Sequence, residues 1–504
     1  MGGYMKTPSL FRHEFLSSNA LGALLPLAGL VLLTSLVSAQ TVPASYQDLY
    51  TQVQNDLNTF DHTLATSWNG VPAPVAFSAQ LLAASSENGT AVLNAGYINS
   101  VWAEMTQLQA LGVKALTVKI NFPTLYSPYY SNASQYQQML SFYEQVASEV
   151  HARGLKLIVE SQVVQPNPGL AGSTVNPFVQ GLSWTAYQTG RAQNAAVIAQ
   201  YVKPEYLSVL TEPDTETAMS GQAQVDTVTG SVQMLTQILA AVKAVNTTGV
   251  QVGAGTGTWQ KSFTQFMNAF AALPMQYLDV HVYPINGAFL QNLITAANIA
   301  HAAGKKIAMS EAWLEKIRDS ELATLSESAS EDRNNWSFWE PLDAQFLTTM
   351  TTVANDEQFA FISPFWVTYF FAYLDYNAAN SSSVPAALQA SMKAMSEGLF
   401  TPPAMAWEAS ILPGSDASAP SVPGMPSLTT TALGVNIAWS PSSDNVGVGG
   451  YTVYRNGNSL GTTAATSFTD FTAKIGIPYA YTVAAFDAAG NVSPKCSPVQ
   501  SSRR

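Results

Sequence analysis

Cysteine and charged side chains are both scarce in this sequence. Cys496 is the one cysteine among 504 residues, which excludes an intramolecular disulfide and a metal site built from several cysteines. Charged residues make up 11% of the chain, well below the roughly 25% typical of soluble domains, so a disordered polyelectrolyte is excluded as well. Since 47% of the residues are hydrophobic, we expect a large buried core to stabilise the protein.

Positively charged residues are scarcer than negatively charged ones. The chain has 21 Lys and Arg residues against 33 Asp and Glu residues, a net charge of −12. Such a balance repels the phosphates of nucleic acids and of anionic lipids, so we expect neither as a partner. A neutral substrate fits this composition better, and no feature of the sequence indicates an oligomeric state.

Several catalytic motifs are missing too. No Gly-rich phosphate loop follows the first predicted strand, which disfavours a doubly wound open sheet, the second choice for the fold. The Gly-x-Ser-x-Gly turn of a serine esterase does not occur in residues 69–400. A His-Glu-x-x-His metal motif is also missing from the sequence. We therefore expect no metal and no cofactor.

The first 39 residues have the pattern of an export signal. Basic residues precede an apolar run over residues 20–37, and small residues lead up to Ala39. The pattern predicts cleavage before Gln40, and therefore a secreted protein that is not held in a membrane after cleavage. An uncleaved membrane anchor is the alternative, which Pro26 inside the apolar run disfavours.

Residues 40–400 are predicted to form a (β/α)8 barrel. Short β-branched runs alternate there with longer helical stretches, a pattern typical of a parallel sheet covered by helices. Gly112, Gly154 and Gly304 each stand between a helical stretch and an apolar run, as helix-ending glycines do. Eight strands are predicted, over residues 75–81, 115–121, 156–161, 206–211, 251–255, 277–283, 306–310 and 359–366.

The composition changes beyond residue 400. Residues 401–426 are rich in Pro, Ser and Ala, which predicts a linker. Residues 427–504 contain short alternating segments separated by turns, which predicts an all-β domain with Asn456 and Gly457 at a hairpin turn. Its predicted strands cover residues 435–439, 451–455, 467–471 and 479–486.

This last segment resembles a fibronectin type III module. The resemblance rests on Trp439, on the stretch 444–457 and on the stretch 481–493. It implies a sandwich of two antiparallel sheets. A module of this kind is expected to act mostly as a spacer, and direct sugar binding is the alternative role.

Two glutamates stand where predicted barrel strands end. Glu212 follows the fourth strand, directly before Pro213, and Glu311 follows the seventh. Because active sites of such barrels lie at the carboxyl ends of the strands, we expect the two carboxyl groups to converge on one pocket. Strand alternation is expected to place Glu212 on one face with Ser208 and Leu210, and Glu311 on one face with Ile307 and Met309.

A converged carboxyl pair suits glycosidic cleavage, in which one carboxyl gives a proton to the leaving oxygen and the other attacks the sugar carbon. The residues around both glutamates resemble clan A of the retaining glycoside hydrolases, which act on β-linked polysaccharides and oligosaccharides. The resemblance implies that Glu212 is the acid/base and Glu311 the nucleophile. It also implies catalytic roles for His281 and Tyr283, with the tyrosine bonded to the nucleophile. Thr211 departs from the clan, which usually has Asn there.

Other acids near predicted strand ends keep alternatives open. Glu216 is the first replacement if Glu212 proves wrong, and Asp214 and Glu160 are further rivals. Glu160 is also a candidate substrate contact. A non-catalytic polysaccharide-binding or adhesion protein on a degenerate barrel is the alternative function, and it predicts loss of either Glu212 or Glu311.

Aromatic residues after the predicted strands support a carbohydrate substrate, because sugar rings stack on flat side chains. We expect the substrate to contact Trp259, Trp313, Trp336, Trp339, Trp366 and Tyr369.

Overall fold

The computed structural model describes residues 40–68, 71–164, 175–246, 248–377, 384–411, 419–430, 434–443, 448, 450–463, 466–474, 477–486 and 491–502. The export signal predicted over residues 1–39 lies outside these residues. The chain divides into two compact units. The first contains Ser45–Asn334 and Thr349–Val367, and the second contains Asn335–Thr348 and the chain from Thr368 onward.

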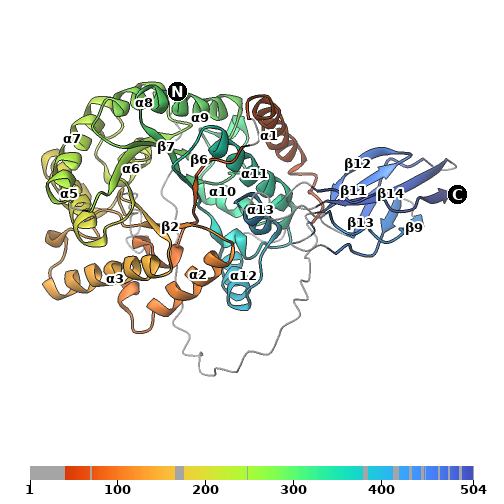
Figure 1. The fold of residues 1–504 in the computed structure, drawn as a ribbon, viewed down its shortest axis with the longest axis horizontal. Helices are drawn as coiled ribbons and strands as arrows, with labels where there is room; N and C mark the ends of the chain where they lie inside the picture. The colour runs from red at the N-terminus through yellow and green to blue at the C-terminus, as the bar shows by residue number, and fades with distance from the viewer. Residues whose placement is uncertain are drawn as a thin grey trace. The chain divides into compact units, whose positions relative to one another are not determined.

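A closed barrel of eight parallel strands forms the centre of the first unit (Figure 1). The strands are β1 (Ala76–Phe77), β2 (Ala115–Lys119), β3 (Lys156–Glu160), β4 (Tyr206–Ser208), β5 (Gln251–Gly257), β6 (Tyr277–Val282), β7 (Lys306–Ala312) and β8 (Phe361–Pro364). Pairing runs from β1 through β8, β7, β6, β5, β4 and β3 to β2. The backbone bond from Leu81 N to Thr117 O, 2.8 Å long, joins the end of the β1 segment to β2 and closes the sheet. The predicted (β/α)8 fold is confirmed, and each strand begins within two residues of its predicted start.

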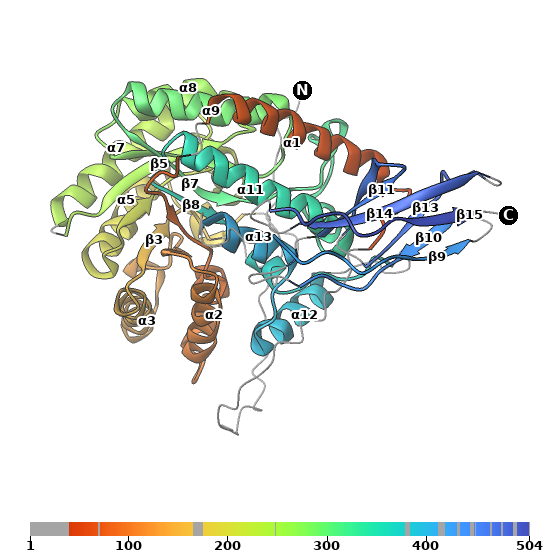
Figure 2. The same cartoon turned by 45° about the vertical axis from the view of Figure 1, so that its right-hand side comes forward.

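Helices surround this sheet, as Figures 1 and 2 show for α2, α3, α5, α7, α8 and α9. Gly112, Gly154 and Gly304 have φ values of 77°, 73° and 65°, so all three predicted helix-ending glycines adopt the left-handed conformation. The helices from the N-terminal side are α1 (Gln47–Ser67), α2 (Ile98–Ala110), α3 (Ala133–Ala152), α4 (Pro177–Gln180), α5 (Trp184–Val197), α6 (Pro213–Ser220), α7 (Val228–Val245), α8 (Phe263–Ala271), α9 (Gly287–Ala302), α10 (Glu327–Asn334) and α11 (Glu340–Asp356).

Helix α7 is, among the described residues, the one helix long and apolar enough to cross a membrane. Its apolar face is buried through Met234, Leu235 and Ile238. The helix packs against α5 in the layer that covers the barrel, which accounts for its apolar character.

The barrel interior changes from apolar to polar along the strands. Hydroxyl and carboxyl groups follow the apolar layer: Ser78 Oγ lies 2.9 Å from Thr117 Oγ1, and Ser208 Oγ donates to Asp279 Oδ2 at 2.5 Å. The carboxyl ends of the strands are therefore the polar end of the interior. The apolar layer at the opposite end consists of Ala76, Ala115, Ile158, Tyr206, Tyr277, Ala308 and Phe361.

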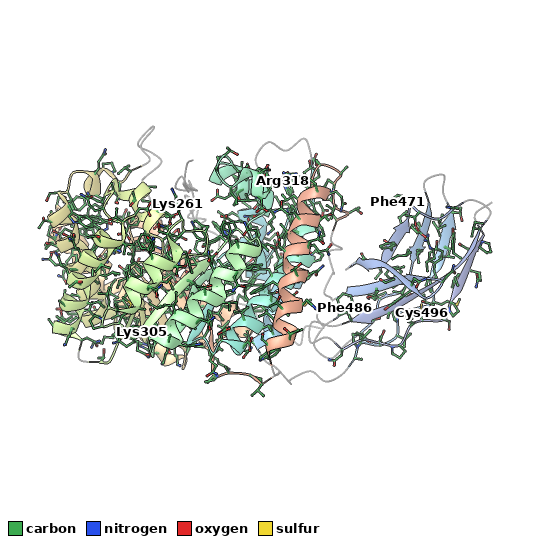
Figure 3. The ribbon with its side chains drawn as sticks, turned by 90° about the horizontal axis from the view of Figure 1, so that it is seen from above. Lys261, Lys305, Arg318, Phe471, Phe486 and Cys496 are labelled. Carbon is green, nitrogen blue, oxygen red and sulfur yellow. The ribbon has the colours of Figure 1, made fainter. Side chains whose placement is uncertain are left out.

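The second unit contains an antiparallel sandwich. One sheet has β9 (Ser427–Thr430), β10 (Val435–Ala438) and β13 (Ser467–Asp470), and the other has β11 (Gly450–Arg455), β12 (Asn458–Thr463), β14 (Pro478–Phe486) and β15 (Val499–Ser502). Trp439, Tyr451 and Cys496 are buried in its core, and Figure 3 labels the cysteine. Asn456 and Gly457 have φ values of 49° and 86°, so the predicted hairpin turn between β11 and β12 is confirmed.

The predicted linker over residues 401–426 needs a correction at its start. Besides α12 (Val384–Glu397), the second unit contains α13 (Pro402–Ile411), in which Trp407 is fully buried. Pro402 and Pro403 were interpreted as linker residues, yet proline is favourable in the first turn of a helix, where its missing N–H has no partner to lose. Residues 419–426 carry no helix or strand.

Candidate active site

Glu212 lies at the carboxyl end of the barrel, beyond the end of β4. The chain after β4 stays paired with β5, because Val209 N donates to Gly253 O at 2.9 Å and Gly255 N donates to Leu210 O at 2.7 Å. Glu212 then precedes the first residue of α6, Pro213, which ends the strand and begins the helix. The carboxyl group of Glu212 is thus placed by a turn from strand to helix, and only 4% of the residue is exposed.

Glu311 reaches the interior through a β-bulge in β7. Asp279 pairs with Ala308 and His281 with Glu311, so three steps along β7 match two along β6. The pairing with β8 shifts in the same stretch, between Met309 and Ala312. The predicted shared face of Ile307, Met309 and Glu311 is therefore wrong. Ala308 belongs to the interior layer, and the extra residue turns Glu311 inward after it.

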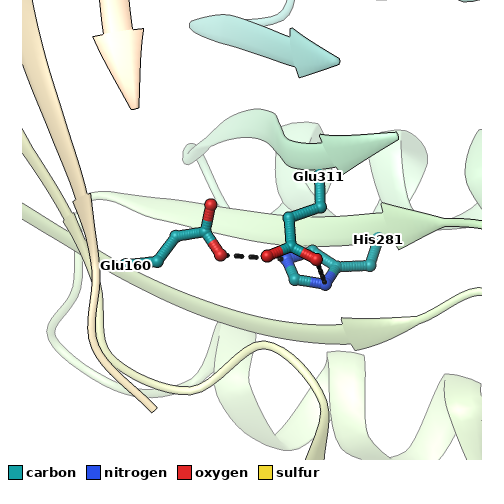
Figure 4. Close-up of side chains that lie close together, drawn as sticks. All are labelled: Glu160, His281 and Glu311. Carbon is teal, nitrogen blue, oxygen red and sulfur yellow. Dashed lines mark ion pairs between the residues drawn. The ribbon is translucent and has the colours of Figure 1, made fainter. Parts of the chain in front are cut away.

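His281 joins the two glutamates. Its Nδ1 atom lies 2.8 Å from Glu212 Oε1 and 3.4 Å from Glu311 Oε2. Its Nε2 atom lies 2.9 Å from Ser310 Oγ and 3.9 Å from Glu160 Oε2. Figure 4 shows the imidazole with two of its carboxyl neighbours. Because carboxylates only accept hydrogen bonds, Nδ1 carries the hydrogen that points toward them.

Glu311 is held as a carboxylate by positive charge. Lys119 Nζ lies 2.5 Å from Glu311 Oε1, and Tyr283 donates its hydroxyl to Glu311 Oε2. Burial alone would raise the pKa of Glu311, but Lys119 and His281 lower it to about 2. The contact expected between Tyr283 and Glu311 is present.

The surroundings of His281 favour its protonated form. Burial alone would lower its pKa, yet the carboxylates of Glu311, Glu212 and Asp279 raise the pKa above its usual value. A protonated imidazole adds a second positive charge beside Glu311. The site therefore combines one firmly ionised carboxyl with donors that stabilise its charge.

Ligand atoms of Glu160, His281 and Glu311 lie within 4.8 Å of one another, as a metal site would require. The Lys119 ammonium lies on the same Glu311 carboxyl, however, and would repel a cation there. This donor set fits a metal poorly.

One of the rival acids, Glu216, has structural partners. Glu216 is fully buried and accepts from Arg191 Nε and Nη2, both at 2.9 Å, and from Tyr187. Arg191 also donates to the backbone carbonyls of Ser161, which follows β3, and Val209, which follows β4. The ion pair therefore connects the ends of these two strands. The interpretation of Glu216 as a replacement acid is wrong, because Arg191 uses both carboxylate oxygens.

Asp214 and Glu160 lie close to the site. Asp214 accepts from Trp259 Nε1 at 2.9 Å, and burial and the Glu212 charge raise its pKa to about 7. Glu160 is 0% exposed and accepts from Gln80 Nε2 at 2.6 Å. This burial does not favour the substrate contact predicted for Glu160, which stays a prediction.

The aromatic residues predicted to stack on sugars differ in exposure. Trp259 is buried, and its ring lies 5.9 Å from that of Tyr283, which is hydrogen-bonded to Glu311. Trp366, after β8, is half-buried and lies 4.6 Å from Phe365. The remaining four are buried, with Trp313 in the first unit and the other three in the second: Trp313, Trp336, Trp339 and Tyr369. Burial of these four rings does not favour the predicted stacking.

Several site residues were missed by the sequence analysis. Lys119 ends β2, Gln80 follows β1 and Phe365 follows β8, with its ring 4.2 Å from Lys119 Nζ. Lys119 had a signal in the sequence, because it is a lysine inside the predicted strand 115–121. A charge in a strand that must be buried on both faces requires a charged partner.

Comparisons with known proteins extend over part of the chain. No family model matches it. Exoglucanase A of Cellulomonas fimi is 51% identical over 82 residues, which is 16% of this chain and 9% of that protein. The match is too short to contain the barrel, and the chain spans less than a tenth of this relative.

Solved structures resemble the chain at low sequence identity. The GH53 catalytic domain of Ignisphaera aggregans is 13% identical, with a TM-score of 0.39, over 62% of this chain and 89% of that one. An endo-beta-1,4-mannanase of Cellulomonas fimi is 14% identical, with a TM-score of 0.35, over 88% and 97%.

Proposed function

We propose that this protein is a secreted, retaining glycoside hydrolase that cleaves a β-linked polysaccharide or oligosaccharide. The observation that carries the proposal is the convergence of Glu212 and Glu311, from different strand ends, on the single Nδ1 atom of His281. Two carboxyls at the carboxyl end of a barrel are the groups that glycosidic cleavage needs.

Glu311 suits the role of nucleophile because it is kept ionised. In the first step an oxygen of Glu311 attacks the anomeric carbon while the bond to the leaving oxygen breaks. That oxygen takes the proton of the Glu212 carboxyl. In the second step the Glu212 carboxylate takes a proton from water, the water oxygen attacks the anomeric carbon, and Glu311 leaves as a carboxylate. One glycosidic bond and one water are consumed, and both carboxyls return to their starting states.

The spacing of the carboxyls supports retention. Since Glu212 Oε1 and Glu311 Oε2 lie 2.8 Å and 3.4 Å from one nitrogen, these oxygens are at most about 6.2 Å apart. Retaining enzymes have separations of about 5–5.5 Å and inverting enzymes about 6.5–9.5 Å, because the latter leave room for a water. Tyr283 and His281 act on Glu311 as hydrogen-bonding groups that stabilise its charge.

Three observations support a neutral carbohydrate substrate: the scarcity of Lys and Arg, the partly exposed Trp366, and the short stretch similar to an exoglucanase. Secretion rests on the signal pattern of residues 1–39. Expression of the full sequence in a secreting host should yield a protein in the medium that begins at Gln40, by N-terminal sequencing. A product that stays in the membrane with residue 1 intact would contradict secretion.

The activity test compares the wild type with Glu311→Gln and Glu212→Gln on soluble β-linked glucans, mannans and galactans. We expect each variant to lose at least about 1,000-fold in kcat, because each removes a group that acts in bond cleavage. Glu149→Gln, which removes a surface carboxylate paired with Arg153, is the control and should keep wild-type activity. NMR of the first product should show the anomeric configuration of the substrate. Near-full activity of either site variant, or an inverted product, would contradict the proposed mechanism.

A further inference from the structure

Two buried carboxyl groups face each other at the end of the barrel. The carboxyls of Glu160 and Glu311 point toward one another in Figure 4. Ligand oxygens of the two carboxyls lie within 4.8 Å of each other. Glu160 Oε2 is, within the described part of the chain, a buried oxygen that finds no hydrogen-bond donor when Glu160 is treated as an acceptor. Two buried carboxylates this close repel each other, whereas a carboxylic acid can donate a strong hydrogen bond to a carboxylate. The geometry therefore requires one proton for the pair.

The neighbours decide which carboxyl holds that proton. Glu311 has the Lys119 ammonium at 2.5 Å, the His281 imidazole at 3.4 Å and the Tyr283 hydroxyl on its oxygens. Glu160 has the neutral amide of Gln80 at 2.6 Å, and the imidazole only at 3.9 Å. Positive charge surrounds Glu311, so the negative charge belongs there and the proton belongs to Glu160.

The electrostatics agree with the geometry. Burial and the charge of Glu311 raise the pKa of Glu160 well above its usual range, although Lys119 acts in the opposite direction. The hydrogen bond from Glu160 is among the influences that lower the pKa of Glu311. A proton on Glu160 and a charge on Glu311 stabilise each other.

We propose that Glu160 is a positioning residue that remains a neutral carboxylic acid and donates a hydrogen bond to the nucleophile Glu311. Its role in turnover rests on the proposed function. Gln80 orients the acid by donating to Glu160 Oε1, which leaves Oε2 to carry the hydrogen toward Glu311. Both a carboxylate and the carbonyl oxygen of a glycosyl ester accept hydrogen bonds, so Glu160 keeps its proton when Glu311 forms the ester.

Infrared spectroscopy tests the protonation without any substrate. The spectrum of the wild type minus that of Glu160→Gln, recorded at about pH 7, should contain the band of a protonated carboxyl. Glu149→Gln should instead remove carboxylate bands, since it lacks one surface carboxylate. Carboxylate bands in the Glu160 difference would overturn the proposal.

A second infrared measurement uses the wild type alone, in case Glu160→Gln does not fold. At about pH 10 the buried acids Glu104, Asp214 and Glu340 are ionised, because burial raises the pKa values of the first two to about 7 and that of Glu340 to about 8. A protonated carboxyl band that persists there supports the neutral acid, and a spectrum without any such band overturns it.

Turnover tests the positioning role. Glutamine keeps the shape of Glu160 and an N–H donor toward Glu311, whereas leucine keeps the volume and lacks the donor. We expect kcat of Glu160→Leu to lie about 10- to 100-fold below that of Glu160→Gln, with similar KM, because a hydrogen bond to a charged group is lost. A purely structural role would make the two variants equally slow, which would overturn the inference. If the wild type cleaves no glycan, the proposed function fails, while the infrared result still decides the state of Glu160.

Discussion

Replacing Lys119 by methionine tests how the nucleophile is kept ionised. The ammonium lies 2.5 Å from Glu311 Oε1, and the two side chains are 17% and 3% exposed. Against the opposing effect of burial, Lys119 contributes most to lowering the pKa of Glu311 from 4.5 to about 2. A lowering of this size corresponds to about 3 kcal/mol between the protonated and ionised forms.

The sign of the effect follows from proton linkage. A carboxyl with a lower pKa in the folded state stabilises the fold above its unfolded pKa, and that stabilisation is lost as the pH falls through the folded pKa. For Glu311 this window runs from 4.5 down to about 2. Lys119→Met should therefore lower the free energy of unfolding by about 3 kcal/mol at neutral pH, as expected for breaking a buried ion pair. The difference from the wild type should shrink below about pH 4.

Urea unfolding at about pH 7 and pH 3 measures the stability, and the pH profile of kcat/KM measures the ionisation of the nucleophile. We expect the acidic limb of this profile to move to higher pH in Lys119→Met, because Glu311 then takes up a proton more readily. Lys156→Met is the matched control, since Lys156 is exposed at the first residue of the neighbouring strand β3 and should change stability by less than about 0.5 kcal/mol. Unchanged stability together with an unshifted profile in Lys119→Met would refute the reasoning.

Two further predictions concern the scaffold that holds the site. Glu216→Gln removes the charge partner of the fully buried Arg191, and urea unfolding should show a loss of about 3–5 kcal/mol. A loss below about 1 kcal/mol would contradict a structural role for this pair. Gly253→Ala places a Cβ atom 2.2 Å from the Tyr277 ring, so we expect a loss of about 1–3 kcal/mol. In Gly287→Ala the added Cβ atom meets no atom within 4 Å, so this variant is the control. Equal melting temperatures of the two variants in thermal unfolding would contradict overpacking at Gly253.

The fold could be predicted largely from local patterns. Runs of apolar residues located all eight barrel strands, and Gly112, Gly154 and Gly304 located helix ends by their conformational freedom. The helix α13 was missed, because the prolines before Ala404 indicated a linker while the apolar residues after them form a buried helix face. The linker-like composition describes the whole segment 401–426, whereas the burial of α13 depends on the apolar residues along one face of the helix.

The candidate site could be predicted in its residue types and only partly in its geometry. The carboxyl groups of Glu212 and Glu311 were expected to converge, and both lie beside Nδ1 of His281. The β-bulge that turns Glu311 inward could not be predicted, because a register shift depends on what the neighbouring strands bond to. The burial of Trp313 was missed for a related reason: exposure depends on which elements cover a side chain.

The sequence by itself determined which strands and helices form and in what order, since hydrophobic periodicity and helix-ending glycines act between residues close in the chain. It also determined that acids stand at the ends of the fourth and seventh strands. Only the tertiary structure decided which groups lie against each acid. Lys119 beside Glu311, Arg191 on Glu216 and Gln80 on Glu160 are contacts between separate strands and helices. Burial among these partners, rather than residue type, separates one ionised carboxylate from its protonated neighbour.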